Sequence, residues 1–210
     1  MNKFKYSIFL LIISIFSTTA QNNPDAERII NDLISKVRTV AVRTHFRLSV
    51  TGKNDVNSQS NSGTFTMKAN KFMLVTDGMK VWFDGKTQWA LMSQNNEVSV
   101  TEPTEAELAD TNPMAVLSAF KTKSKIIFGK TKSNRNYVID LIPKIKNSGF
   151  NKIEVQIDKS NGNLSTIKML TKDGTTLLTL TDYQSGIQVN DQDFIFNKAK
   201  FKGVTINDLR

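Results

Sequence analysis

The sequence has no cysteine and only one histidine, His45, among its 210 residues. Zinc sites in proteins are built mainly from cysteine and histidine, so this composition argues against one. The serine-hydrolase motif G-x-S-x-G is absent, and so are the glycine patterns G-x-x-x-x-G-K-S/T and G-x-G-x-x-G that bind nucleotide phosphates. His45 lies between Arg43 and Arg47 in an alternating stretch, where we expect a solvated side chain. We therefore expect no metal and no cofactor.

The two Asp-Gly pairs of the stretch DGMKVWFDGKTQW, residues 77–89, are the remaining candidates for catalytic carboxylates. Glycosidases need two carboxyl groups roughly 5–9.5 Å apart. Asp77 and Asp84 stand at opposite ends of one predicted strand, and seven extended residues span about 23 Å. Aspartate followed by glycine is typical of tight hairpin turns. We interpret both aspartates as turn residues and expect no enzymatic activity.

Only one long apolar run is present, at residues 6–16, preceded by Lys3 and Lys5 and followed by small residues up to Ala20. This pattern is typical of a secretory signal peptide cleaved after Ala20. The run is shorter than the about 20 apolar residues of a membrane-spanning helix. We predict a signal peptide at 1–20 and a single domain at 21–210. Export without cysteine suits a soluble protein of the bacterial periplasm.

The chain is basic, with 28 lysines and arginines against 19 acidic residues and a formal net charge of +9. Loss of Lys3 and Lys5 with the leader lowers this charge to +7. The lysines are scattered except at 121–125 and 198–202, and neither cluster has the interleaved aromatic residues of a base-stacking surface. We expect no nucleic-acid partner. A solvated surface and docking on an acidic partner or on anionic headgroups remain open alternatives.

Residues 24–40 have apolar side chains at three- and four-residue steps, which predicts a helix. From Arg43 the pattern alternates and predicts a strand whose apolar face carries Thr44, Phe46, Leu48 and Val50. We predict a polar hairpin loop at 52–63. Further strands are predicted at 64–69, 71–76, 80–84, 87–92, 97–100, 137–142, 153–158, 164–170, 176–183 and 194–196.

Residues 102–121 interrupt the strands with two helix-start patterns. Pro103 is followed by acidic residues, and Asn112-Pro113 places a capping residue before a proline. Short strands separated by turns favour an antiparallel sheet curled into a barrel or sandwich. We predict a mostly β, α+β fold in which a strongly curved antiparallel sheet of about ten or eleven strands carries helices on one side.

Large apolar side chains alternate with polar ones along several predicted strands. The inward face of such a curved sheet is filled by its own side chains and the helices, or it encloses a ligand. The pattern alone leaves a dry core and a ligand cavity open. The pairs that define this face are Phe46 and Leu48, Phe65 and Met67, Phe72 and Leu74, and Trp89 and Leu91.

Four segments together resemble a known family. They are GTFTMKANKF at 63–72, LVTDGMKVWFDGKTQW at 74–89, NPMAVL at 112–117 and DFIFNKAKFKGVTIND at 193–208. In this order and spacing they are similar to the periplasmic lipoprotein carriers of the LolA family. The series MKANKF, WFDGKTQW and NEVSVTEPTEAEL resembles in particular the variant found in Bacteroidetes. The resemblance covers nearly all of the mature chain.

The resemblance implies an unclosed β-barrel with a helical lid and, between them, a cavity that shelters the acyl chains of lipoproteins crossing the periplasm. It implies a monomer that is loaded by an inner-membrane ATP-driven release complex and delivers its cargo to an outer-membrane acceptor. It implies neither catalysis nor a cofactor. The alternative is a sensor or scaffold on the same half-barrel that binds lipids or lipoproteins to regulate a partner.

The sheet side of the cavity is predicted to carry Phe46, Leu48, Phe65, Met67, Phe72, Leu74, Trp89 and Leu91, and the lid Met114, Leu117 and Phe120. Trp82 is left without an assigned face. Methionine adapts to irregular cargo, and Met67, Met73, Met92 and Met114 are predicted to supply such a surface. One departure concerns the lid latch, because the Arg-Pro pair of familiar carriers is replaced by Lys68-Ala-Asn-Lys71. We do not assign the latch role to either lysine.

Overall fold

The computed structural model describes residues 22–55, 58–108, 112–146 and 148–210, so the predicted signal peptide lies outside the described residues. Helix α1 (Pro24–Thr39) begins where the Asn23 side chain accepts a hydrogen bond from the Ala26 amide at 3.0 Å. Pro24 fits the first helical turn because it needs no amide hydrogen there. The helix predicted at 24–40 is confirmed, and its buried face consists of Ala26, Ile30, Leu33, Ile34 and Val37.

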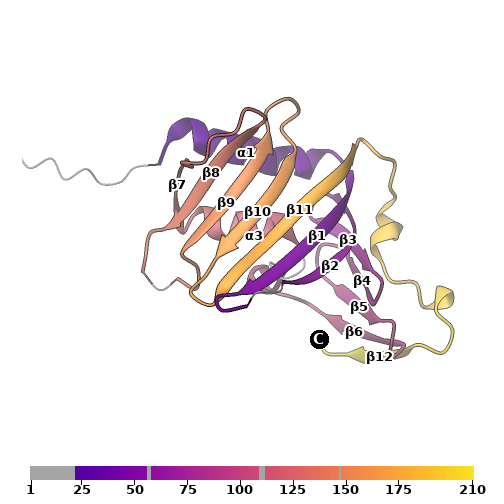
Figure 1. Ribbon diagram of the computed structural model, residues 1–210. Coiled ribbons are helices and arrows are strands. Elements are labelled where there is room, and N and C mark those ends of the chain that lie inside the picture. Colours follow the sequence, from indigo (N-terminus) through magenta and orange to yellow (C-terminus); the bar gives the residue numbers. More distant parts are fainter. Residues whose placement is uncertain (1–21, 56–57, 109–111, 147) are drawn as a thin grey trace, which may run out of the picture.

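The strands of the described residues form one twelve-stranded sheet (Figure 1), so the predicted mostly β architecture is confirmed, with twelve strands in place of ten or eleven. The strands are β1 (Val42–Gly52), β2 (Gln59–Lys68), β3 (Lys71–Thr76), β4 (Met79–Phe83), β5 (Gln88–Met92), β6 (Glu97–Thr101), β7 (Ser124–Phe128), β8 (Asn136–Pro143), β9 (Lys152–Asp158), β10 (Leu164–Leu170), β11 (Gly174–Ser185) and β12 (Thr205–Asp208).

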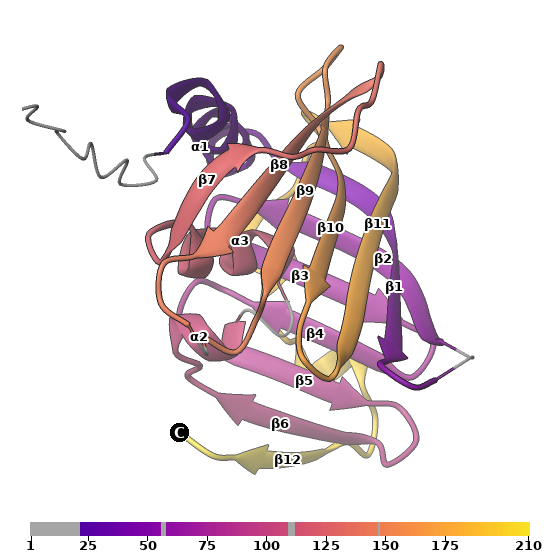
Figure 2. The same ribbon diagram turned by 60° about the vertical axis from the view of Figure 1, so that its left-hand side comes forward.

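The strand order is β12-β6-β5-β4-β3-β2-β1-β11-β10-β9-β8-β7. Neighbouring strands are antiparallel, except that β12 pairs with β6 in parallel. The N-terminal half of the sheet joins the C-terminal half where β1 pairs with β11, from Val42 opposite Ser185 to Gly52 opposite Gly174. In the described part of the chain, the edge strands β7 and β12 do not pair with each other, so the curved sheet stays unclosed (Figure 2).

Two strands were not predicted from the sequence. At the start of β7, Lys123 and Lys125 alternate with the buried residues Ser124 and Ile126, and the charge of the 121–125 cluster concealed that alternation. Strand β12 has no buried side chain and therefore no apolar pattern. It forms because its backbone pairs with that of β6, which sequence periodicity does not report.

One predicted strand and the bounds of one predicted loop were wrong. Residues 194–196 are not a strand, because the 3₁₀ helix η1 (Asp191–Phe194) places Phe194 in a fully buried position and Phe196 against the ring of Trp82. The hairpin loop predicted at 52–63 is shorter, because β1 and β2 continue pairing up to Val50 opposite Gln59. The β2 residues of that stretch are polar and exposed, so their backbone pairing left no apolar pattern in the sequence.

The helical insertion forms α2 (Glu105–Leu108) and α3 (Pro113–Lys121), as predicted. The Asn112 side chain caps α3 by accepting a hydrogen bond from the Met114 amide at 2.9 Å. At the other end of α3, Lys121 Nζ donates to Asn31 Oδ1 of α1 at 2.5 Å. Figure 2 shows α2 and α3 between strands β7–β10 and strands β3–β5.

The two faces of the sheet carry separate apolar clusters. The inner cluster lies on the face that meets the helices and includes Phe65, Phe72 and Phe83, whose ring centroids are 5.5 and 5.3 Å apart in succession. The outer cluster consists of Trp82, Leu91, Val98, Val100 and Val204, with Met73, Trp89, Phe196 and Phe201 packed against it. The segment after β11 covers the outer cluster, which is why both faces of β4 and β5 are apolar.

Candidate ligand-binding cavity

The inner face is only partly filled by its own side chains. Buried phenylalanines form its centre, whereas the surrounding apolar side chains are half-buried and pack against the inner cluster from one side. Half-buried apolar surface in a concave setting is characteristic of small-molecule sites. These half-buried side chains are Leu48 of β1, Met79 of β4, Ala90 of β5, Met169 of β10, Leu178 and Leu180 of β11, and Val116 and Phe120 of α3.

A cavity of about 490 Å³ opens at one end of the inner face. Its walls come from α1, the turns at the ends of β2–β5, α2 and α3, and include Val37, Met67, Phe83, Leu108, Met114 and Ala115. Its polar rim includes Arg38, Lys86 and Glu102. A volume between about 300 and 1,000 Å³ is usual for small-molecule pockets. This cavity therefore has the size and the apolar lining to hold part of a lipid.

Nine of the eleven predicted cavity residues lie together in the structure. Phe46, Phe65, Met67, Phe72, Leu74, Met114 and Leu117 belong to the inner cluster, and Leu48 and Phe120 pack against it. Only Met67 and Met114 of this group line the open cavity. Phe65 and Phe72 are buried in the centre of the core. The inner face therefore contains both a packed core and an open cavity, which the sequence pattern left as alternatives. Binding of acyl chains by these nine residues stays a prediction.

The predicted inward orientation of Trp89 and Leu91 is wrong. Strand β5 pairs with β4 so that Trp89 lies opposite Trp82 and Leu91 opposite Lys80, and both side chains join the outer cluster. The reason is the loop at 84–87, which places Gln88 opposite Phe83 and thereby puts Ala90 on the inner face opposite Val81. Met73 also faces outward, and Trp82 takes the outer face.

Sequence reasoning missed several inner-face residues. Val81 and Phe83 are buried in the inner cluster, and Met79 and Leu178 pack against it. The pairing of Phe72 with Phe83 across the 77–78 turn would have identified the β4 residues, because directly opposite residues share a face. Leu178 lies in a run of leucines and threonines, and because Leu177 is its neighbour, the sequence does not show which of the two leucines faces inward.

The two lysines at the site of the missing Arg-Pro pair bind elsewhere. Lys68 and Lys71 both form ion pairs with Asp191, at 3.3 and 2.7 Å, on the outer side of the sheet. Lys68 Nζ also donates to the Val189 carbonyl at 3.3 Å. These contacts hold the segment after β11. A hydrogen bond from Lys121 to Asn31 joins α3 to α1.

The polar residues considered for chemistry have structural roles. Asp84 Oδ1 accepts hydrogen bonds from the amides of Lys86 and Thr87, at 2.9 and 2.8 Å, as expected of a turn residue. His45 is exposed, and its Nδ1 lies 3.2 Å from Asp182 Oδ2. Burial against the inner cluster raises the pKa of Tyr183 to about 12, so this phenol stays neutral. Within the described ranges, no group of three or more histidine or acidic residues is placed to hold a metal ion.

Residues 16–174 match the family of the outer membrane lipoprotein carrier protein LolA. The chain belongs to this family. The match spans β1–β10 and the helical insertion described above, and it ends at the first residue of β11. No curated protein matches this LolA-family sequence.

Of three solved structures similar to this LolA-family chain, one has a TM-score above 0.5, and that match supports a shared fold. An uncharacterized conserved protein from Thermus thermophilus superposes with a TM-score of 0.57 at 10% identity, covering 88% of this chain and 99% of that one. A LolA superfamily protein from Nitrosomonas europaea has a TM-score of 0.43 at 11% identity, covering 81% and 97%. The Pseudomonas aeruginosa MucA/MucB complex has a TM-score of 0.48 at 14% identity, covering 83% and 62%. Likeness at such identities concerns the fold alone.

Among the residues that the structure describes, no helix has the length and apolar character to span a bilayer.

Proposed function

We propose that this protein is a periplasmic carrier that shelters the acyl chains of lipoproteins on its inner face and moves them from the inner to the outer membrane. The observation that carries the proposal is the partly filled inner face, where half-buried leucine and methionine side chains surround a buried aromatic centre beside an open cavity of about 490 Å³. Membership of the LolA family supports the choice of cargo.

The energetics of this surface suit a carrier. Transfer of an acyl chain from water to an apolar site gains about 0.8 kcal/mol per buried CH₂ group. Met67 and Met114 line the cavity, and Met79 packs against the inner cluster. Methionine side chains are flexible and polarizable, so they accommodate chains of different length without one fixed fit. Such a surface holds cargo and still permits its delivery.

Entry of a longer chain requires α3 to move away from the sheet. Helix α3 contributes Met114 and Ala115 to the cavity wall, and its polar tie to α1 is the hydrogen bond from Lys121. We propose α3 as the lid. Cargo loading by an inner-membrane ATP-driven release complex and delivery to an outer-membrane acceptor complete the proposed cycle.

The test is purification from the periplasm under native conditions, followed by mass spectrometry of bound lipids and lipoproteins. A carrier is expected to co-purify with acylated proteins and to release lipoproteins from spheroplasts when added from outside. Co-purification of lipid without any release from spheroplasts would favour the alternative role as a sensor. Absence of both bound lipid and lipoprotein release would overturn the proposal.

A further inference from the structure

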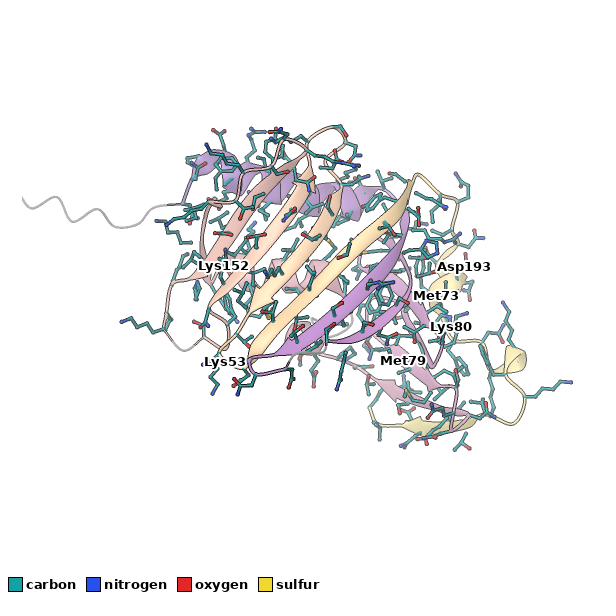
Figure 3. All side chains as sticks on the ribbon, viewed as in Figure 1. Lys53, Met73, Met79, Lys80, Lys152 and Asp193 are labelled. Atoms are coloured by element: carbon teal, nitrogen blue, oxygen red, sulfur yellow. The ribbon has the colours of Figure 1, made fainter. Side chains whose placement is uncertain are left out.

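A second cavity, of about 580 Å³, lies on the outer face of the sheet. It is enclosed between strands β1–β4 and the segment 188–201 that follows β11. Figure 3 shows Met73, Lys80 and Asp193 together on this side of the molecule, beside that segment. The sheet separates this cavity from the inner face, so it belongs to neither the lid nor the proposed acyl site.

The floor of the outer cavity is aromatic and firmly packed. The Trp82 ring meets the rings of Phe196 and Phe201 edge-on, with centroids 5.4 and 5.5 Å away. Phe196 and Phe201 stack on each other at 5.3 Å. Trp82 is only 4% exposed, so it supports the site from below rather than offering its face to a ligand. A site built on such a floor is preorganised.

Four cationic side chains line this cavity: Arg43, Lys80, Lys198 and Lys200. Arg43 Nε donates to Thr66 Oγ1 at 3.2 Å, which fixes the guanidinium on the sheet. Lys80 Nζ lies 5.0 Å from the centre of the Trp82 ring. Among the described residues, none of the four forms an ion pair, whereas Lys68 and Lys71 on the same sheet face both do.

The carboxylate that lines the cavity is already engaged, because Asp193 Oδ2 accepts a hydrogen bond from the Asn190 amide at 2.8 Å. Burial lowers the pKa of Lys80, and the charge of Lys200 lowers it further. The surroundings of Lys80 therefore disfavour its positive charge, and Lys200 is the cation that adds to this effect. An anion placed among the four cations would relieve this repulsion and receive charge-assisted hydrogen bonds.

We propose that the outer cavity binds a phosphate ester of about the size of glycerophosphate, the group shared by free glycerophosphates and the headgroups of anionic phospholipids. Arginine and lysine are the side chains that recognise phosphate oxygens. The volume exceeds that of a bare phosphate ion and lies in the usual range for small organic ligands. An acidic peptide fits less well, because β1–β4 each pair on both sides and offer no free strand edge.

The decisive variants are Lys80→Gln and Lys200→Gln. The control is Lys168→Gln, which removes the same charge from the outer face of β10, away from the cavity. Binding of glycerol 3-phosphate is measured by calorimetry. Binding to phosphatidylcholine vesicles with and without phosphatidylglycerol is measured by co-sedimentation. Loss of one charged hydrogen bond should weaken binding about tenfold in either cavity variant and leave the control unchanged.

Binding of glycerol 3-phosphate with this pattern of losses supports a site for soluble phosphate esters. Binding of phosphatidylglycerol vesicles alone, with the same pattern, supports a headgroup site. No binding of either probe, or equal loss in Lys168→Gln, would overturn the proposal. Preference for a polyglutamate peptide over both probes would also overturn it. Lys200 is exposed on the short helix η2 (Lys198–Lys200), so its variant remains decisive even where Lys80→Gln fails to fold.

Discussion

Lys71 Nζ of β3 lies 2.7 Å from Asp191 Oδ2, and Lys68 of β2 approaches the other oxygen of the same carboxylate at 3.3 Å. One aspartate thus ties two neighbouring strands to the segment that covers the outer cluster. In this chain, the two lysines at the position of the Arg-Pro pair expected from the family resemblance hold the C-terminal segment.

The Asp191 ion pairs should make stability depend on pH. Hydrogen bonds and charge from Lys71 and Lys68 lower the pKa of Asp191 in the folded state. The folded protein therefore binds this proton less readily than the unfolded chain. The stabilisation is complete above the ordinary aspartate pKa of about 3.9 and is lost as the pH falls through the lower folded value.

Asp191→Asn is accordingly expected to be less stable than the parent at neutral pH and to converge with it in acid, as measured by urea unfolding across a pH series. Asp77→Asn is the matched control, because Asp77 is exposed and has no ion pair among the described residues. A stability difference for Asp191→Asn that stays constant down to about pH 2 would contradict the ion-pair account.

Phe194→Ala should release the C-terminal segment. The Phe194 side chain is 0% exposed and is the most deeply buried residue of that segment. Truncating a buried phenylalanine costs about 3–5 kcal/mol. We expect amide hydrogen exchange in β12 and around Phe201 to accelerate strongly, while the amides of β8–β10 keep their protection.

Phe128→Ala provides the comparison, because Phe128 is 42% exposed on the edge strand β7. Its truncation should change stability by about 1 kcal/mol or less. If the β12 amides of Phe194→Ala exchange as slowly as those of the parent, other contacts hold the segment.

Leu177 and Leu178 offer a direct test of the inner face. Both are half-buried in β11, but Leu178 pairs with Leu48 and joins the inner cluster, whereas Leu177 pairs with Ser49 and Lys168. A carboxylate on the inner face would have to be desolvated against an acyl chain. Leu178→Glu should therefore weaken binding of a fluorescent fatty acid by about tenfold or more, and Leu177→Glu should leave it near the parental value. Equal effects of the two substitutions would mean that the inner face is not the binding surface.

Asn31→Ala should loosen the proposed lid. Asn31 Oδ1 accepts the hydrogen bond from Lys121 that joins α1 to α3, and both side chains are half-buried. A partly exposed bond to a charged donor contributes about 1 kcal/mol, which corresponds to roughly a fivefold change in an opening equilibrium. We expect a bound fatty-acid probe to dissociate a few times faster in stopped-flow measurements. Ser35→Ala, an exposed change on the same helix, should leave the rate unaltered; an unaltered rate in Asn31→Ala would exclude this bond as a lid contact.

The sequence predicted those parts of the fold in which local chemistry and burial agree. The cap at Asn112 and the Asp84 turn are local, so the residue types alone identified them. Strand β12 depends on backbone pairing with a strand about a hundred residues earlier and leaves no local pattern.

Nine of the eleven predicted residues lie together on the inner face, but the orientation of β5 was not predictable. Alternation identifies two faces of a strand without saying which one is inward. In β5 this is misleading, because the outer cluster buries large apolar side chains on the face opposite the inner core. Leu91 consequently becomes an outward-facing residue that packs with Trp82, Val98 and Val100. The outer cavity escaped prediction because its wall at 188–201 meets the strands only in the folded molecule.

The junction of β1 with β11 constrains how the protein reaches its native state. These central strands pair residues more than a hundred positions apart, from Val42 with Ser185 to Gly52 with Gly174. Closing so long a loop is slow, because the loop loses conformational entropy before the stabilising contacts between its ends have formed. We therefore expect the two halves of the sheet to meet late in folding, so that the inner face is completed only when β11 has joined β1.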